Sequence, residues 1–126
     1  MAAFMEITQE STEPLIISFV PSDEHANING FVHGGYLFFL CDELVGRYVK
    51  AIGRRGAAAD SNIHYYRPAH LRQKLYAGIS ERKPGKQPGT CLVELRNEEQ
   101  TLIADALFTV AFKTEQHNVA GILNRI

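Results

Sequence analysis

Apolar residues recur at helical spacing in the stretch that follows the glycine pair Gly34-Gly35. One stripe of this stretch consists of Leu37, Leu40, Cys41, Leu44, Tyr48 and Ile52. Side chains three or four residues apart share one face of an α-helix. Gly53 and the two arginines after it suit the end of such a helix, because glycine often caps it and positive charge complements the negative end of its dipole. The pattern predicts one long helix from about Gly34 to Ile52.

The opposite stripe of this predicted helix contains Gly35, Phe39, Asp42 and Gly46. An interior glycine destabilises a helix by about 1 kcal/mol relative to alanine. Two glycines on one stripe therefore favour a close approach by a ligand or by another chain. The alternative is an ordinary amphipathic helix whose Asp42 side chain is simply solvated. The spacing alone leaves both interpretations open.

Five short runs with β-branched or alternating apolar residues predict strands. They are Leu15–Val20, Ala57–Arg67, Leu71–Lys83, Thr90–Arg96 and Thr101–Lys113. The first run ends at Pro21 and is predicted to be an edge strand, because proline cannot donate a hydrogen bond to a neighbouring strand. Residues typical of turns and loops separate the elements at 21–30, 84–89 and 97–100.

The order of these elements predicts an α+β fold in a single domain, residues 1–126, with its core at about 14–113. Four consecutive strands joined by short turns are expected to pair antiparallel, and one helix can cover only one face of their sheet. Residues 1–13 are mostly polar and are expected to be loosely held. Residues 114–126 are expected to form a frayed tail or a short helix.

The strand predicted at Ala57–Arg67 has small side chains on both of its faces. Ala57 and Ala59 fall on one face, and Ala58 falls on the other. Small side chains allow another chain to approach closely, and a single helix leaves one face or edge of the sheet open. We therefore expect a dimer.

Composition and charge exclude several other classes of protein. The chain of 126 residues is 45% hydrophobic and 21% charged, with a net charge of −1, so no overall field attracts nucleic acid. Cys41 and Cys91 lie among apolar neighbours and are expected to be buried, reduced thiols of a cytoplasmic protein. The five histidines form no metal-binding signature, so we expect no metal site. We expect no secretory signal and no membrane span, because no apolar run approaches about 20 residues.

Two runs of the sequence resemble a known family. Residues 27–35 read NINGFVHGG, and Asp42 follows nine residues after His33. Residues 60–69 read DSNIHYYRPA and end in a Tyr-x-x-Pro-Ala signature. Together these runs resemble the hot-dog-fold acyl-CoA thioesterases of the PaaI type, over about residues 21–113.

The resemblance implies a hot-dog fold, in which an antiparallel sheet wraps around one long central helix and active sites lie between two subunits. It implies that the backbone N–H of Gly34 binds the thioester carbonyl, and that Asn27 helps to hold this carbonyl or the attacking water. It implies that Asp42 is a general base or a nucleophile, with His33 and Gly35 in support. The implied substrate is an acyl-CoA and the implied assembly is a homodimer or a dimer of dimers, without a cofactor.

These roles are physically reasonable for a helix start and a carboxylate. Free N–H groups and the positive end of a helix dipole stabilise an oxygen that gains negative charge, and a carboxylate can activate water or attack directly. Gly34 and Asp42 are eight residues apart, which is about 12 Å along a helix. They cannot both touch one carbonyl from the same chain. If both act, Asp42 must come from the other subunit.

The sequence also departs from the family. Many relatives have a serine or threonine hydroxyl that holds the water at the position of Ala58. Asp60 is expected on the same side of the strand and could substitute, or water alone could suffice. Phe38 and Phe39 could line a pocket for an acyl or aryl group, or they could simply pack in the core or between subunits.

Three functions therefore compete. The leading hypothesis is a thioesterase that hydrolyses a small to medium acyl- or aryl-CoA. The second is a hot-dog protein that binds acyl-CoA without hydrolysing it, which the missing hydroxyl at Ala58 favours and the carboxylate of Asp42 disfavours. A hydratase or dehydratase on the same fold fits poorly, because the sequence lacks the Asp-x-Asn-Pro-x-His motif expected for it.

Overall fold

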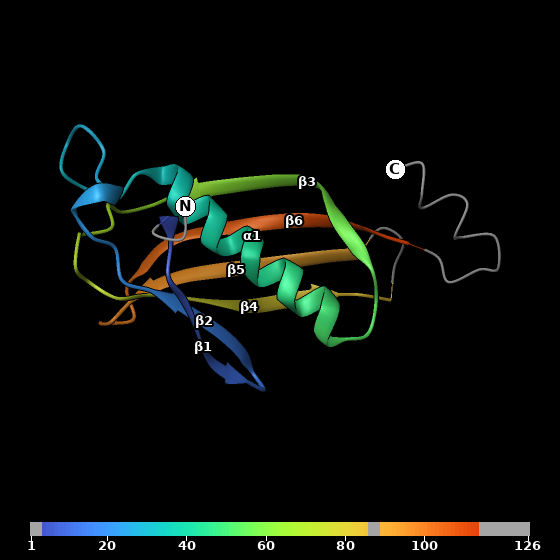
Figure 1. Cartoon of the computed structure of the whole chain (residues 1–126). Helices are drawn as coiled ribbons and strands as arrows, with labels where there is room; N and C mark the ends of the chain where they lie inside the picture. Colours follow the sequence, from blue (N-terminus) through green and yellow to red (C-terminus); the bar gives the residue numbers. More distant parts are fainter. Residues whose placement is uncertain (1–3, 86–88, 114–126) are drawn as a thin grey trace.

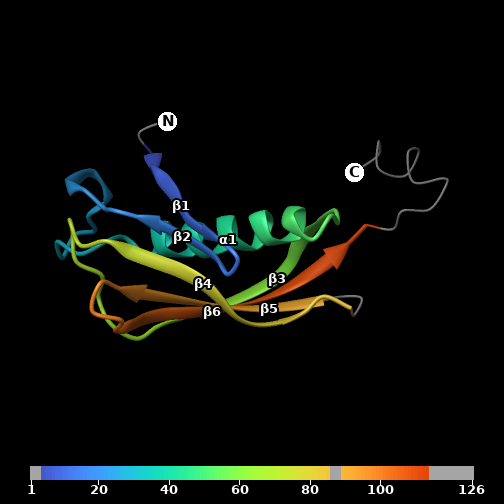
Figure 2. The ribbon, with the colours of Figure 1, turned by 90° about the horizontal axis from the view of Figure 1, so that it is seen from below.

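A helix of 18 residues, α1 (Gly34–Ala51), lies along one face of a six-stranded antiparallel sheet (Figure 1). The computed structural model describes residues 4–85 and 89–113. Seen after a rotation of 90°, the sheet curves around the helix (Figure 2). The predicted α+β hot-dog fold is confirmed, and the predicted helix matches α1 to within one residue at its end.

The sheet contains two strands before α1 and four strands after it. They are β1 (Ile7–Thr12), β2 (Leu15–Phe19), β3 (Gly56–Tyr65), β4 (Leu75–Lys83), β5 (Gly89–Asn97) and β6 (Leu102–Phe112). Their spatial order is β1-β2-β4-β5-β6-β3, so β1 and β3 form the two edges. A short 3₁₀ helix, η2 (Asp23–His25), lies in the connection between β2 and α1.

Two expectations about the N-terminal part of the chain were wrong. Residues 7–12, which were expected to be loosely held, form β1, and this strand pairs with β2 along its length. The strand predicted at the edge, β2, is therefore interior and lies between β1 and β4. Polar contacts anchor β1: Glu10 accepts a hydrogen bond from the Ser18 hydroxyl at 2.6 Å and pairs with Lys74 at 2.8 Å.

The strand predicted to begin at Leu71 begins at Leu75 instead. Residues 71–73 form a turn, in which Arg72 has a positive φ of 65°. A residue in the left-handed conformation interrupts an extended strand. The apolar side chain of Leu71 does not indicate this conformation, so the start of β4 was predicted too early. The tail or helix predicted at 114–126 and part of the loop predicted at 84–89 lie outside the described residues.

The core lies between α1 and the concave face of the sheet. The helix buries Leu37, Leu40, Cys41, Leu44, Val45, Tyr48 and Val49. Every second residue of β5 and β6 faces this stripe, as the alternation in the sequence predicted. Ile52, which was predicted on the buried stripe, lies just beyond the helix and is 38% exposed.

The edge strand β3 differs from β5 and β6 in its exposure. Eight of its ten residues are exposed, and the first residue, Gly56, and Ile63 are half-buried. Within the described chain β3 pairs only with β6, so its outer edge presents unpaired backbone groups. An exposed edge strand of this length is available for pairing with another chain.

Gly56 provides a test of this packing. A Cβ atom at this position would lie 2.7 Å from the carbonyl oxygen of Ala111, whereas a Cβ on Gly78 would come no closer than 3.9 Å, to the side chain of Ile16. We expect Gly56→Ala to lower the free energy of unfolding by about 1–3 kcal/mol, because overpacking forces the backbone to shift. Denaturant unfolding measures this change. The matched variant Gly78→Ala should retain wild-type stability, and equal losses in both variants would contradict the described packing.

Candidate functional site

The first turn of α1 leaves one backbone N–H group free. His33 caps the helix: its Nδ1 accepts a hydrogen bond from the N–H of Gly35 at 3.3 Å. The carbonyl oxygen of His33 accepts from the N–H of Tyr36 at 3.0 Å. The N–H of Gly34 has no hydrogen-bond partner among the residues that the structure describes. This donor lies at the positive end of the helix dipole, where an oxygen that gains negative charge is stabilised.

Tyr65, the last residue of β3, fixes the start of the helix against the sheet. Its hydroxyl donates a hydrogen bond to the carbonyl oxygen of Gly34 at 3.0 Å. Its ring lies so close that a Cβ atom on Gly34 would be 3.2 Å from it. A glycine is therefore favoured at position 34 by a close contact as well as by access to its N–H group.

Asn27 shapes the loop that leads to the helix. Its Oδ1 accepts hydrogen bonds from the N–H groups of Asn29 at 2.8 Å and Phe31 at 3.1 Å. Its Nδ2 has no partner within residues 4–85 and 89–113. The amide oxygen is thus committed to the loop, while the amide nitrogen remains able to donate to a carbonyl or a water.

Asp42 lies two turns into α1, on the flank that faces the β6–β3 edge of the sheet. Phe38, one turn earlier on this flank, stacks on Phe108 of β6 with a centroid distance of 5.7 Å. Asp42 has no hydrogen bond or ion pair within the described part of the chain. Partial burial raises the pKa of its carboxyl group, and the negative charge of Glu43 raises it further. Both causes favour the protonated form relative to a free aspartate.

The structure brings only part of the predicted site together within one chain. His33, Gly34 and Gly35 are adjacent at the helix start. Asp42 is about 12 Å further along the same helix, so it cannot reach a carbonyl bound at Gly34 of its own chain. A complete site with these two groups needs a second copy of the chain.

The expectation that Asp60 shares a side of the strand with Ala58 was wrong. A β-bulge at Ala59 interrupts the register between them. Ala58 pairs with Val110, which is buried on the helix-facing side, whereas Asp60 pairs with Thr109 on the outer side. The extra residue of a bulge shifts the alternation of side chains. Asp60 therefore cannot replace a hydroxyl at position 58.

The same bulge places a residue that the sequence analysis missed. Ser61 pairs with the buried Phe108, so its side chain points to the helix-facing side of the sheet. Simple alternation from Ala58 would have placed it on the outer side. The run Ala57–Ala59 contains no residue type that marks a bulge, so this change could not be predicted from the residues.

The two phenylalanines proposed for an acyl pocket have different environments. Phe38 is half-buried against Phe108 and belongs to the packing between helix and sheet. Phe39 is 37% exposed and contacts Phe4 edge-to-face, with centroids 4.9 Å apart. Together with neighbours at the helix start, Phe39 lines a shallow pocket of about 330 Å³. Its lining residues are Phe4, His33, Gly35, Tyr36 and Phe39.

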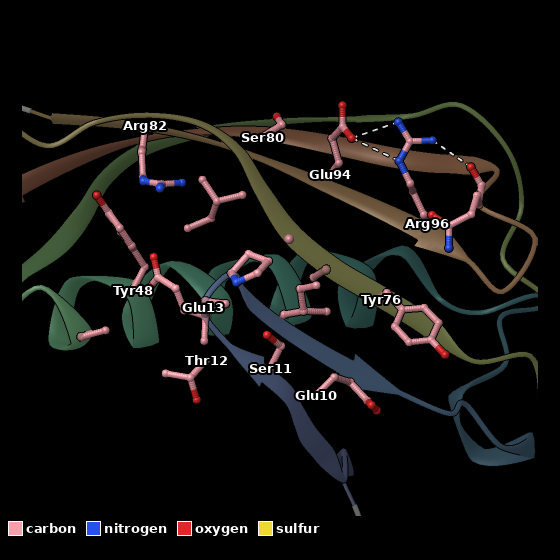
Figure 3. Close-up of a pocket in the computed structure, with 18 of the residues that line it drawn as sticks. Glu10, Ser11, Thr12, Glu13, Tyr48, Tyr76, Ser80, Arg82, Glu94 and Arg96 are labelled. Atoms are coloured by element: carbon pink, nitrogen blue, oxygen red, sulfur yellow. Dashed lines mark hydrogen bonds and ion pairs between the residues drawn. The ribbon is translucent and has the colours of Figure 1, made fainter.

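A larger groove of about 810 Å³ lies elsewhere, between the β1–β2 hairpin, β4 and the second half of α1 (Figure 3). Tyr48 and Arg82 line one end of the groove, and Arg96 lines the other. Arg96 is already paired with Glu94 at 2.9 Å. None of the predicted site residues lines this groove. We therefore place the candidate site at the start of α1, where a free donor is available, and not in this larger groove.

The described part of the chain comprises residues 4–85 and 89–113. Within these ranges, no group of three or more His, Cys, Asp or Glu side chains could hold a metal ion. No helix in the same ranges is long and apolar enough to cross a membrane. Both cysteines are free and buried, and burial raises the pKa of the Cys41 thiol to about 12, so this thiol is a poor nucleophile.

Known proteins resemble this chain in sequence and in structure. It is 32% identical to a putative esterase of Archaeoglobus fulgidus over 75% of this chain and 61% of that protein, so it spans less than two thirds of that relative. It is 25% identical to the acyl-coenzyme A thioesterase PaaI of Escherichia coli over 86% of this chain and 73% of PaaI. A crystal structure of a threonine-to-alanine mutant of a hypothetical thioesterase from Streptococcus pneumoniae has a TM-score of 0.78 and 26% sequence identity, and the similarity covers 89% of this chain and 93% of that chain. A crystal structure of the hypothetical thioesterase with coenzyme A also has a TM-score of 0.78, with 24% identity over 90% of this chain and 94% of that chain.

The family assignment combines these similarities with the observed architecture. The helix start with its free N–H group lies inside residues 29–104, which match the thioesterase superfamily. The matched range contains α1, β3, β4 and β5. The predicted resemblance to PaaI-type hot-dog thioesterases is confirmed at the level of the family. The chain belongs to the thioesterase superfamily.

Proposed function

We propose that this protein hydrolyses acyl-CoA thioesters at a site built from two copies of the chain. The observation that carries the proposal is the unpaired N–H of Gly34 at the start of α1. The names of relatives support the substrate class, since PaaI of E. coli is an acyl-coenzyme A thioesterase and the S. pneumoniae structure contains coenzyme A. We assign the small to medium acyl or aryl group to the shallow pocket of about 330 Å³ beside Phe39.

In the proposed reaction, the thioester oxygen accepts a hydrogen bond from the N–H of Gly34, and the Nδ2 of Asn27 is a second donor. A water oxygen adds to the carbonyl carbon while the carboxylate of Asp42 takes one proton from this water. The C–S bond of the resulting tetrahedral intermediate then breaks, and the CoA sulfur takes up the proton that Asp42 holds. The products are a carboxylic acid and free CoA thiol.

A direct attack by Asp42 is the alternative route. A carboxylate oxygen would add to the carbonyl carbon and expel the CoA thiolate, and water would then hydrolyse the mixed anhydride. Both routes need an ionised carboxylate near the bound carbonyl. A single turnover in ¹⁸O-labelled water separates them when water opens the anhydride at the Asp42 carbonyl carbon, because the product acid then keeps an unlabelled Asp42 oxygen and the ¹⁸O enters Asp42.

Three observations support the dimer that this mechanism requires. Gly34 and Asp42 are about 12 Å apart along one helix, so one chain cannot supply both to one carbonyl. The edge strand β3 is exposed along most of its length. A Cβ atom on Gly46 would meet nothing within 4 Å, so the chain's own packing does not explain this glycine, whereas a partner close to α1 would. We propose a homodimer, alone or as half of a dimer of dimers.

A non-catalytic acyl-CoA-binding protein is the second candidate, and Ala58 favours it. The S. pneumoniae thioesterase was crystallised as an aspartate-to-alanine and as a threonine-to-alanine mutant. The separation of these two residues along that chain equals the separation of Asp42 and Ala58 here. If this spacing matches the two chains, Ala58 stands where the threonine-to-alanine mutant has its introduced alanine. Retention of Asp42 favours the enzyme, because a binding protein needs no carboxylate beside the carbonyl.

The substitution Asp42→Asn tests the proposal. We expect hydrolysis to fall by about 10²-fold or more, because the amide cannot act as a base or as a carboxylate nucleophile. The assay measures free thiol released from a panel of short, medium, long, phenylacetyl and hydroxybenzoyl CoA thioesters. Glu43→Gln is the matched control, since Glu43 is the adjacent carboxylate and pairs with Arg47 on the helix surface. Tight binding of an acyl-CoA by a wild type that hydrolyses no member of the panel would establish the binding protein instead.

The pH dependence of kcat/KM gives an independent prediction. Burial and the charge of Glu43 raise the pKa of Asp42 above its ordinary value, so the ionised base is lost at a higher pH than for a free aspartate. As pH falls, activity should therefore decline with a midpoint above about 3.9. Rates for one substrate over an acidic pH series, with the fraction folded monitored in parallel, measure this midpoint. A midpoint at or below the ordinary value would contradict the described environment of Asp42.

A further inference from the structure

We propose that the hydroxyl of Ser61 orients the attacking water, a role for which position 58 has no hydroxyl. This inference rests on the proposed thioesterase function and assigns a further catalytic residue to the same site. It follows from three features of the structure. They are the position of Ser61 along α1, the side of the sheet to which its side chain points, and the lack of a hydrogen-bond partner for its hydroxyl among the described residues.

The position of Ser61 along α1 follows from the relative direction of α1 and β3. The contact of Tyr65 with Gly34 joins the end of β3 to the start of α1. A connection of only four residues, 52–55, joins the end of α1 to the start of β3, so the two elements run in opposite directions (Figure 1). Asp42 lies about 12 Å along the helix from Gly34. Ser61 lies about 13 Å along the strand from Tyr65, so both residues are displaced by similar lengths, in the same direction, from the contact between Tyr65 and Gly34.

The side to which Ser61 points follows from the register of β3. Because of the bulge at Ala59, Ser61 pairs with Phe108 and faces the helix. Phe108 is also the residue on which Phe38 stacks, at 5.7 Å. Asp42 lies one turn beyond Phe38 on the same flank of α1. Ser61 and Asp42 therefore both border the space between this flank and β3.

The hydroxyl of Ser61 is available for this role. Ser61 is exposed, and its Oγ has no hydrogen-bond partner among the described residues. The other polar groups of β3 are less suitable: Asp60, Asn62 and His64 point to the outer side, and the Tyr65 hydroxyl already donates to Gly34. Ala58 faces the helix but has only a methyl group.

The Ser61 hydroxyl can accept a hydrogen bond from the attacking water. The attacking water gives one hydrogen to Asp42, and its second hydrogen needs an acceptor so that a lone pair points at the carbonyl carbon. A serine oxygen can accept this hydrogen bond. Holding the water in this orientation removes part of the entropic barrier to its attack. Substrate binding does not depend on this contact, so its loss should lower kcat and leave KM nearly unchanged.

The test compares Ser61→Ala with the wild type and with two further variants on the acyl-CoA substrate that the wild type turns over fastest. We expect Ser61→Ala to lower kcat by about tenfold or more, with KM within about twofold of the wild type. Ser61→Thr keeps a hydroxyl and should retain most of the activity. Asn62→Ala removes the neighbouring polar side chain on the outer side and should leave kcat unchanged. Thermal unfolding and the oligomeric state are measured for every variant, and Ser61→Val, which also lacks a hydroxyl and is favoured in strands, replaces Ser61→Ala if the latter does not fold.

The outcomes separate this inference from the function on which it rests. An active wild type whose kcat is the same in Ser61→Ala overturns the role of Ser61 alone. The role is also overturned if Ser61→Ala and Asn62→Ala lose the same activity, or if the loss appears in KM. A wild type that hydrolyses no thioester of the panel overturns the proposed function and this inference together.

Discussion

Burial of α1 in the curve of the sheet sets the geometry of the candidate site. Leu40, Cys41 and Leu44 are completely buried between the helix and the alternating apolar side chains of β5 and β6. This packing fixes the position of the helix start, and Tyr65 adds a hydrogen bond that fastens this start to the end of β3. The free N–H of Gly34 and the carboxylate of Asp42 thus sit on one rigid element, which suits groups that must be preorganised.

The same rigidity explains why one chain is not enough. A helix holds residues eight positions apart at about 12 Å, and no side-chain rotation brings the N–H of Gly34 to the carboxylate of Asp42. The helix flank with Asp42 faces the β3 edge, where backbone groups and small side chains are exposed. We propose that a second copy binds at this edge and brings its own Asp42 to Gly34 of the first. Dimer formation is then part of the chemistry in this account, rather than an addition to a finished site.

The sequence predicted the elements whose patterns are regular. The spacing of Leu37, Leu40 and Leu44 predicted α1, and alternation predicted β5 and β6. β1 was missed because Ile7–Thr12 is largely polar and is held by pairing with β2, a long-range contact without a local pattern. Asp60 was placed on the wrong side because the alternation rule assumes a strand without a bulge. The candidate residues Gly34 and Asp42 came from the family resemblance, whereas Ser61 required the register of the folded sheet.

The central claim, that each site combines Gly34 of one subunit with Asp42 of the other, is tested most directly by mixing two inactive variants. Gly34→Pro removes the N–H donor at the first position of a helix, where proline is common, and Asp42→Asn removes the carboxylate. Because the proline ring also crowds the side chain of Tyr65, thermal unfolding and dimer formation of both variants are measured before they are mixed. After co-expression in equal amounts, half of the dimers are mixed, and each mixed dimer has one intact site. The account predicts recovery of about a quarter of the wild-type activity. If each site lies within one chain, the mixture stays as inactive as its two components, and that result would contradict the account.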